Sequence, residues 1–315
     1  MSLQLPWHRA TRTGIDLGTR WIKAVELNAD GSVARCVRFP RGAEALDESE
    51  IARLCEILRR QGFTLRTVTL LAAQGSLRRQ VVRLPDKPDP TRDDAIVRNQ
   101  FAELEGEPGE IAWWELPRSR RATDGREALA YEADHATTAA LLGGFEAQGV
   151  RVRGIDTHSS AFTRAVGRGD CVVADLGWSR LGLMLAVEGL PVYERSDPAG
   201  GLESLVRAET ERTERTGEQV ESLIRNEDSD RGLLGLPGAM GWARTTAESI
   251  TATADYAVRR YALAETPRVV LTGGGATEEV ARALGGLIGL ELEVAGGGVE
   301  ADQFAALAAA RRWAA

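Results

Sequence analysis

Two short loops of the sequence combine an aspartate with a glycine in the manner of a phosphate-binding turn. The first is Asp16-Leu17-Gly18-Thr19, and the second is Asp175-Leu176-Gly177-Trp178-Ser179. A glycine two residues after the aspartate removes the Cβ that would keep backbone N–H groups away from a phosphate. The carboxylate can hold the water ligands of a Mg²⁺ that bridges phosphates. Either tripeptide alone is a weak signal, because Asp-x-Gly also shapes ordinary strand ends.

The two loops occupy equivalent places in an internal repeat. In each copy an apolar strand leads into the loop, a second strand follows, and a hairpin turn at Asp30-Gly31 or Glu188-Gly189 leads into a third strand. The interval from the aspartate to the turn glycine is nearly the same in both copies. We interpret this repeat as a duplicated lobe, and we expect the two loops to face one ligand from opposite sides.

A third glycine-rich segment, Thr272–Ala276 (TGGGA), follows the buried strand predicted at Val269–Leu271. A helix is predicted directly after it, from Glu278. Consecutive glycines let the backbone lie against a flat base or a sugar, and a helix N-terminus adds partial positive charge. The alternative is a flexible turn.

The composition excludes several classes of protein. The chain has 315 residues, 43% of them hydrophobic and 27% charged, which suits a globular protein of about two domains. A net charge of -7 argues against nucleic acid as a partner. Three scattered cysteines and three scattered histidines indicate neither a disulfide framework nor a zinc site. No apolar run is long enough for a membrane span, and Met1 to Thr13 lacks the apolar core of a secretory signal, so we expect a cytoplasmic protein.

Strands that alternate with helices predict an α/β protein. A stretch of short strands with two helices interrupts this pattern and indicates a small α+β insertion. Thr91 is expected to cap the first of these helices, and the second is expected at Thr137–Gln148. The predicted division is a first lobe at 12–66 and 151–170 with a C-terminal helix at 301–313, an inserted subdomain at 67–150, and a second lobe at 171–300.

The two Asp-x-Gly loops, a glycine pair after the second hairpin, and a strand-Gly-Gly-Gly-helix segment, in this order, resemble the actin, Hsp70 and sugar-kinase superfamily. Within it, Gly14–Gly18 with Ile22–Leu27 resembles the PilM family of type IV pilus assembly proteins, and the resemblance continues at Asp197–Gly201 and Val269–Ala276. It covers nearly the whole chain. It implies an actin-like (ribonuclease H-like), duplicated two-lobed fold with the insertion in the first lobe.

The resemblance also implies the ligands, which are ATP and Mg²⁺. Asp16 and Asp175 would hold the metal through water. We expect Lys23 to contact the loop or the insertion and not a phosphate, because its strand position leaves its direction open. The predicted nucleotide-binding residues are Asp16, Gly18, Thr19, Arg20, Asp175, Gly177, Ser179, Gly200, Gly201, Gly273, Gly274 and Gly275.

The sequence departs from the family beside both loops. Arg20 and Trp21 replace the small hydroxyl residues that usually follow the first loop, and Trp178 and Arg180 stand where small residues are usual in the second. An arginine can add bidentate phosphate contacts. A tryptophan can instead fill the phosphate space, which leaves open a nucleotide-free adaptor of the same fold.

The resemblance implies a scaffold at the inner face of the inner membrane. The scaffold would bind the cytoplasmic tail of a PilN-like membrane protein, in a groove between the first lobe and the insertion, together with other pilus assembly components. We expect slow ATP hydrolysis at most, because no residue is assigned to position the attacking water. A small-molecule kinase is a further alternative, with Asp156 or Asp170 as its base.

The predicted site gives testable substitutions. Asp16→Ala and Asp175→Ala are expected to abolish stabilisation by Mg-ATP with the fold intact. Gly274→Val is expected to weaken nucleotide binding.

Overall fold

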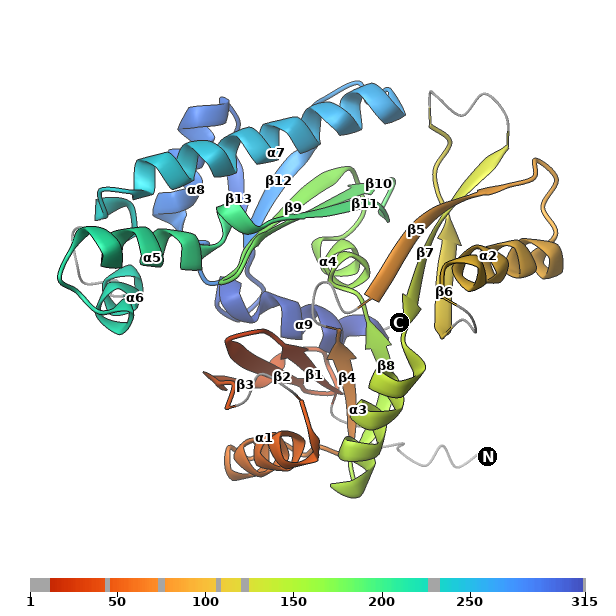
Figure 1. Ribbon diagram of the computed structural model, residues 1–315, viewed down its shortest axis with the longest axis horizontal. Coiled ribbons are helices and arrows are strands. Elements are labelled where there is room, and N and C mark those ends of the chain that lie inside the picture. Colours follow the sequence, from red (N-terminus) through yellow and green to blue (C-terminus); the bar gives the residue numbers. More distant parts are fainter. Residues whose placement is uncertain are drawn as a thin grey trace, which may run out of the picture.

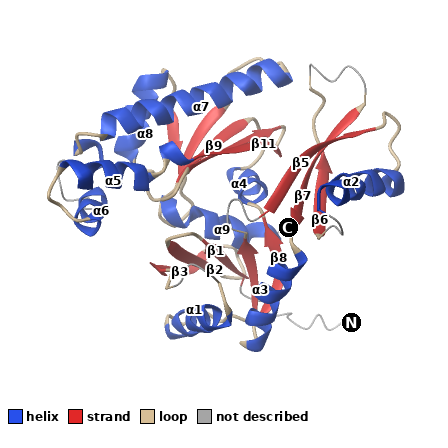
Figure 2. Cartoon of the chain, in the orientation of Figure 1, coloured by secondary structure: helices blue, strands red, loops and turns tan. Residues whose placement is uncertain are grey.

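Two five-stranded sheets and one three-stranded sheet form the framework of the protein. The computed structural model describes residues 12–42, 46–72, 77–105, 109–119, 125–225 and 233–313. Figure 1 shows the two larger sheets on either side of a central helix, with the smaller sheet beside the second of them. The helices cover the outer faces of the sheets, as Figure 2 shows by colour.

The first and second sheets have the same topology. Their strand orders are β3-β2-β1-β4-β8 and β11-β10-β9-β12-β13. In each sheet the first three strands along the chain are antiparallel, and the last two join in parallel. The strands of the first sheet are β1 (Arg12–Leu17), β2 (Trp21–Leu27), β3 (Val33–Pro40), β4 (Thr67–Leu71) and β8 (Arg151–Asp156). Those of the second are β9 (Cys171–Leu176), β10 (Leu181–Val187), β11 (Leu190–Asp197), β12 (Arg268–Thr272) and β13 (Leu292–Val294).

The two hairpin loops are built in the same way, which explains the repeat in the sequence. A Cβ on Gly18 would lie 2.5 Å from the carbonyl oxygen of Trp21, and a Cβ on Gly177 would lie 3.0 Å from that of Arg180. Both turns are therefore too tight for a side chain at the glycine. The strands that enter and leave the second loop are almost wholly buried, in keeping with their unbroken apolar sequence.

The helices follow the amphipathic patterns of their sequences. In α1 the apolar face of Ile51, Leu54 and Leu58 is buried, and Asp47 caps the helix by accepting a hydrogen bond from the Glu50 N–H. Helix α4 (His158–Val166) packs on α9 and on β10 and β11 of the second sheet. The helices beside the first sheet are α1 (Glu48–Arg60), α3 (His135–Ala147) and α9 (Phe304–Ala310). Those beside the second are α5 (Leu202–Arg212), α6 (Gly217–Arg225), α7 (Ala239–Tyr261) and α8 (Glu278–Ile288).

Helix α9 is the buried helix between the two sheets. All seven of its residues, Phe304–Ala310, are buried, and it packs on β1, β2 and α4. Gly14 of β1 permits the close approach, since a Cβ there would lie 2.1 Å from the carbonyl oxygen of Ala306. Small side chains on both elements therefore bring the C-terminal helix against the strand that carries the first loop.

The boundaries of the insertion differ from the predicted 67–150. Strand β4 lies inside the first sheet, between β1 and β8, and α3 packs against α1 and β8. The three-stranded sheet and its helix α2 (Pro90–Glu105) come from residues 77–133 alone. The sequence could not separate these elements, because the partner of a short apolar strand is set by tertiary packing and not by its composition. The strands of this sheet are β5 (Leu77–Leu84), β6 (Glu110–Glu115) and β7 (Arg126–Ala133).

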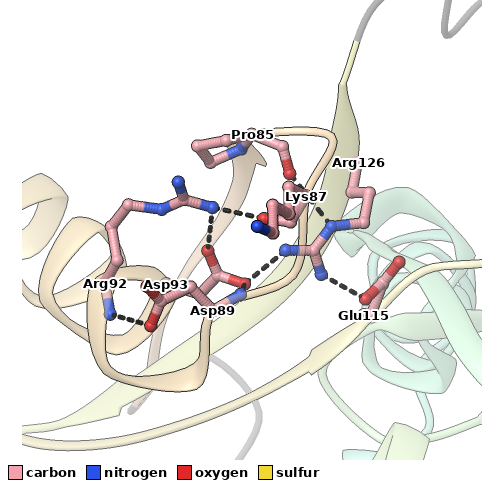
Figure 3. Close-up of polar contacts among 7 residues, drawn as sticks. All are labelled: Pro85, Lys87, Asp89, Arg92, Asp93, Glu115 and Arg126. Atoms are coloured by element: carbon pink, nitrogen blue, oxygen red, sulfur yellow. Dashed lines mark hydrogen bonds and ion pairs between the residues drawn. The ribbon is translucent and has the colours of Figure 1, made fainter.

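A polar network orders the connector before α2 (Figure 3). Asp89 caps the helix by accepting a hydrogen bond from the Arg92 N–H at 3.2 Å, so the predicted cap at Thr91 is two residues late. Pro90 then occupies the first helical position, where a missing N–H costs nothing. The Arg126 guanidinium binds the buried carboxylate of Asp93 and fixes the helix to β7.

The insertion also contacts the second sheet. Trp114 donates a hydrogen bond from Nε1 to the carbonyl oxygen of Pro191 at 2.8 Å, and its ring stacks on Tyr131 at a centroid distance of 5.5 Å. The Tyr131 hydroxyl donates to a Glu194 carboxylate oxygen at 2.9 Å. The smaller sheet thus lies against β11, as Figure 1 shows.

Within the part of the chain that the structure describes, no helix combines the length and the apolar character that a membrane crossing requires. The opening residues 1–11, on which the prediction about a secretory signal depends, lie outside that part.

Candidate functional site

The two Asp-x-Gly loops face each other across one cavity between the lobes. The cavity has a volume of about 130 Å³ and is lined by both loops and by the start of the Gly-Gly-Gly segment. Thr19 Oγ1 and Ser179 Oγ approach to 3.5 Å across it. The predicted residues that line the cavity are Asp16, Gly18, Thr19, Arg20, Asp175, Gly177, Ser179, Gly273 and Gly274.

Three predicted glycines do not line the cavity. Gly200 packs under Leu181, with 2.6 Å between an added Cβ and the Leu181 Cβ. An added Cβ on Gly201 would lie 2.6 Å from the backbone nitrogen of Arg180. Gly275 donates its N–H to the carbonyl oxygen of Leu176 at 3.1 Å. These glycines shape the back of the second loop, and their contact with a nucleotide stays a prediction.

The neighbouring glycines of the third segment differ from each other. Gly273 has φ +91°, and an added Cβ would lie 2.4 Å from Asp175 Oδ1, so a side chain there is excluded. An added Cβ on Gly274 would meet no atom closer than the Leu202 Cδ1 at 3.9 Å. Gly274 thus presents bare backbone to the cavity, with room for a flat ligand against it.

Asp16 lies at the centre of a buried charge cluster. Its Oδ2 accepts a hydrogen bond from Lys23 Nζ at 2.9 Å, and its Oδ1 lies 3.4 Å from His158 Nε2. Burial alone would raise the pKa of Asp16, but the charge of Lys23 and the His158 imidazole outweigh it and hold the pKa well below its usual range. Asp16 is therefore ionised.

Asp175, the counterpart in the second loop, has a different environment. Its strand neighbour at the position that matches Lys23 is Gly182, so the second copy supplies no ammonium. Burial raises the pKa of Asp175, and the attraction of His158 and Lys23 does not cancel that rise. No described residue donates a hydrogen bond to this carboxylate. Asp175 is the acidic group of the site that most needs a cation or a water.

His158 and Lys23 are the cavity residues that the sequence reasoning missed or assigned elsewhere. Lys23 does contact the first loop, as expected, but it also lines the cavity. His158, buried at the start of α4, had no signal in the sequence because its position depends on where β8 ends in the sheet. Burial alone would lower the pKa of His158, but the carboxylate of Asp16 raises it above the ordinary value.

Arg20 closes the mouth of the cavity. It reaches from the first loop to the Glu221 carboxylate of α6, and its guanidinium carbon lies 4.3 Å from the ring centroid of Trp178. The cavity of about 130 Å³ is smaller than the roughly 300–1,000 Å³ that small-molecule sites usually enclose. Arg20 and Trp178 must move before a nucleotide can enter.

The residues present fit a nucleotide with its metal. Asp16 Oδ1 accepts no hydrogen bond of ordinary geometry from the described residues. Asp175 lines the same cavity. Both can hold waters of a phosphate-bound Mg²⁺, whereas direct ligation would need more groups, and the described residues hold no cluster of three or more metal-ligating side chains. Lys23 supplies a fixed positive charge beside the same carboxylates.

No family model and no curated protein matches the sequence. Solved structures nevertheless resemble this one over nearly its full length. A chain of the "PilM-PilN type IV pilus biogenesis complex" aligns with a TM-score of 0.74 and 15% identity, covering 96% of this chain and 98% of that chain. The ethanolamine utilization protein EutJ from Carboxydothermus hydrogenoformans aligns with a TM-score of 0.58 and 17% identity, covering 96% and 89%.

A ROK family glucokinase from Streptomyces griseus, in complex with glucose and AMPPNP, aligns with a TM-score of 0.53 and 16% identity, covering 96% of this chain and 98% of that chain. At sequence identities of 15% to 17%, structural similarity establishes the fold alone. The protein therefore has the duplicated, two-lobed actin-like α/β fold that its sequence predicts, and its structure is similar to that of PilM.

Proposed function

We propose that this protein is an ATP-binding scaffold of a type IV pilus, or of a related inner-membrane assembly complex, and that it binds the cytoplasmic tail of a PilN-like membrane protein. The observation that carries the nucleotide part is the single cavity between Asp16 and Asp175, closed by loops from both lobes. The full-length similarity to a chain of a PilM–PilN complex supports the partner. Such a partner would hold the protein at the cytoplasmic face of the inner membrane.

In this proposal the phosphates of ATP lie between the two loops. The hydroxyls of Thr19 and Ser179, which lie 3.5 Å apart, would separate and donate to phosphate oxygens. Arg20 would exchange the Glu221 carboxylate for a phosphate. Asp175, with Asp16, would hold Mg²⁺ through water, and the base or sugar would lie against Gly274. The similar glucokinase in complex with AMPPNP supports nucleotide binding by this fold.

Hydrolysis is proposed to be slow at most. A water-positioning carboxylate has to be free of strong partners. Among the described acidic residues that line the cavity, Asp16 is bound by Lys23, Glu221 by Arg20, and Asp302 by Arg38 at 2.7 Å. Of these four carboxylates, Asp175 alone has no ion-pair partner, and in this proposal it holds the waters of the Mg²⁺ and does not position the attacking water.

The two residues considered as the general base of a kinase, Asp156 and Asp170, do not suit that role. Asp156 is bound by Arg164 and accepts from the Thr157 N–H, and Asp170 accepts from the Glu188 N–H at 2.8 Å. Neither carboxylate lines the cavity between the loops. A phosphotransfer screen with sugars is expected to give no product.

The nucleotide-free adaptor is the alternative that the tryptophans favour, since Trp21 and Trp178 both line the cavity. Melting curves with and without Mg-ATP separate the two functions. A ligand that binds only the folded state raises the melting temperature, and the adaptor would show no such rise.

Binding of the partner tail is tested by fluorescence anisotropy. A labelled peptide of the cytoplasmic N-terminal tail of a PilN-like protein is titrated with this protein, with and without Mg-ATP. A peptide of the same composition in scrambled order is the control. Saturable binding of the native peptide alone is expected, and equal binding of both peptides, or none, would remove the scaffold role.

A further inference from the structure

A second cavity lies on the other side of His158 from the nucleotide cavity. It has a volume of about 260 Å³ and forms where the insertion, α4 and the second sheet meet. His158 and Arg180 line both cavities, so they form the wall between them. The proposed scaffold role and the predicted site leave this cavity without a function.

Positive charge dominates the lining of the second cavity. Three arginines contribute to it, namely Arg79 of β5, Arg180 of the second loop and Arg195 of β11, against the single carboxylate of Glu194. That carboxylate is already engaged, because it accepts from the Tyr131 hydroxyl at 2.9 Å and lies 3.9 Å from Arg79. The lining therefore carries an excess of positive charge that no lining side chain neutralises.

Two of the arginines keep donors without acceptors. The Arg180 side chain forms no hydrogen bond or ion pair with any described residue. Arg195 donates from one terminal nitrogen to the carbonyl oxygen of Ser249 at 3.3 Å, but its Nε is shielded from solvent and donates to none of the described residues. A buried donor without an acceptor is costly, and a bound oxyanion would remove that cost.

The N-terminus of α4 adds to the positive electrostatic potential of the second cavity. Thr157 caps this nine-residue helix, and both Thr157 and His158 line the cavity. The positive end of the helix dipole thus lies beside the three guanidinium groups. Buried His158 brings a further basic group to the wall.

We propose that the second cavity binds a compact oxyanion, a small molecule bearing phosphate or carboxylate groups, with Arg79, Arg180 and Arg195 as its ligands. The planar guanidinium fork matches both groups in bidentate geometry. A volume of about 260 Å³ lies just below the range of about 300–1,000 Å³ typical of drug-sized ligands, so it suits a compact oxyanion and not an extended peptide. The site goes beyond the scaffold role and does not depend on it.

Isothermal titration calorimetry on the full chain tests this site, without nucleotide or Mg²⁺ and at constant ionic strength. Inorganic phosphate and citrate are the two probes, and the tighter one shows whether the natural ligand carries phosphate or carboxylate groups. Saturable binding of at least one is expected. Arg79→Gln and Arg195→Gln should each weaken it by about tenfold, the loss of one charge-assisted hydrogen bond.

Arg83→Gln is the matched control, since Arg83 is an exposed arginine of the same strand β5 and does not line the cavity. It should bind the probe like the wild type. If Arg195→Gln does not fold, Arg79→Gln decides the question, because the Arg79 side chain is 36% exposed. Stabilisation by Mg-ATP should be unchanged in Arg79→Gln, which separates this site from the nucleotide site.

Three results would overturn the proposal. The first is no binding of either probe by the wild type at millimolar concentration. The second is an equal loss of affinity in Arg83→Gln and Arg79→Gln. The third is phosphate binding that excess ATP displaces and that Arg79→Gln leaves intact, because the ion would then lie in the nucleotide cavity.

Discussion

Arg20 of the first lobe lies over the ring of Trp178 of the second lobe, with 4.3 Å between the guanidinium carbon and the ring centroid. The same guanidinium binds Glu221. These contacts join the lobes beside the cavity. Two residues that depart from the family pattern thus form the contact that a nucleotide has to displace.

Trp178 should therefore report nucleotide binding through its fluorescence. Mg-ATP that draws Arg20 away from the ring changes the surroundings of Trp178. The emission change on adding Mg-ATP is expected to be much smaller in Trp178→Phe, where Trp21 is the remaining tryptophan of the described residues that line the cavity. It should persist in Trp113→Phe, since Trp113 lies on β6 and donates to Asp94. An unchanged signal in Trp178→Phe would show that Arg20 and Trp178 stay together when ATP binds.

The two loop aspartates should differ in the ligand-free protein. Asp16→Asn leaves the partly buried ammonium of Lys23 without its partner and should lower the free energy of unfolding by about 3 kcal/mol. Asp175→Asn should raise it, because a folded pKa above the unfolded value means that the ionised form costs stability at neutral pH. Urea unfolding of both variants measures this difference.

Both variants should lose stabilisation by Mg-ATP. The expectation from the sequence that both variants keep the fold stays a prediction, and the ion pair of Asp16 with Lys23 adds that the Asp16 variant is the less stable of the two. Equal destabilisation by the two substitutions would contradict the structural ion pair of Asp16 with Lys23.

Gly274→Val and Gly273→Ala form a second contrasting pair. An added side chain at Gly274 extends into open space, so the free energy of unfolding should stay within about 0.5 kcal/mol of the wild type. It occupies room that the base or sugar needs, so Mg-ATP affinity should fall at least about tenfold. Gly273→Ala should destabilise the protein itself, through positive φ and the contact with Asp175. Unchanged ATP affinity in Gly274→Val, by calorimetry, would remove this segment from the site.

Stability should fall as the pH rises above about 6.5, the ordinary pKa of histidine. The folded pKa of His158 is raised, so its contribution is complete below the unfolded pKa and is lost as the pH rises through the folded pKa. The groups that act on it are Asp16, Asp175 and Glu194. The slope is at most about 1.4 kcal/mol per pH unit for one proton.

His158→Gln should remove this part of the pH dependence, measured as unfolding free energies between pH 6 and pH 9, a range of about three units around the transition. His135→Gln is the control, since His135 is exposed at the start of α3. Parallel curves for the wild type and His158→Gln would place the proton on another group.

The sequence was informative where local chemistry and topology agree. The two loops could be paired because each sits between strands of a repeated hairpin, and the two sheets do share one strand order. The tight turns at Gly18 and Gly177 follow from the same pattern. The positions of the two loops and their tight turns could therefore be predicted from the sequence, because neighbouring residues determine them.

The missing parts depend on contacts between distant segments. Lys23 reaches Asp16 through the register of β1 with β2, and His158 reaches it through the parallel order of β4 and β8. The assignment of β4 to the insertion failed for the same reason, because its pairing with β1 is long-range. Gly200, Gly201 and Gly275 carried the glycine signal of a ligand site but serve backbone packing.

Calorimetric titration of Mg-ATP into the full-length protein, beside the Asp175→Asn variant, tests the central claim most directly. The account predicts saturable binding of one nucleotide per chain to the wild type and no measurable binding to Asp175→Asn, with both proteins folded. No heat of binding in the wild type, or equal binding in the two proteins, would contradict a nucleotide site between the loops.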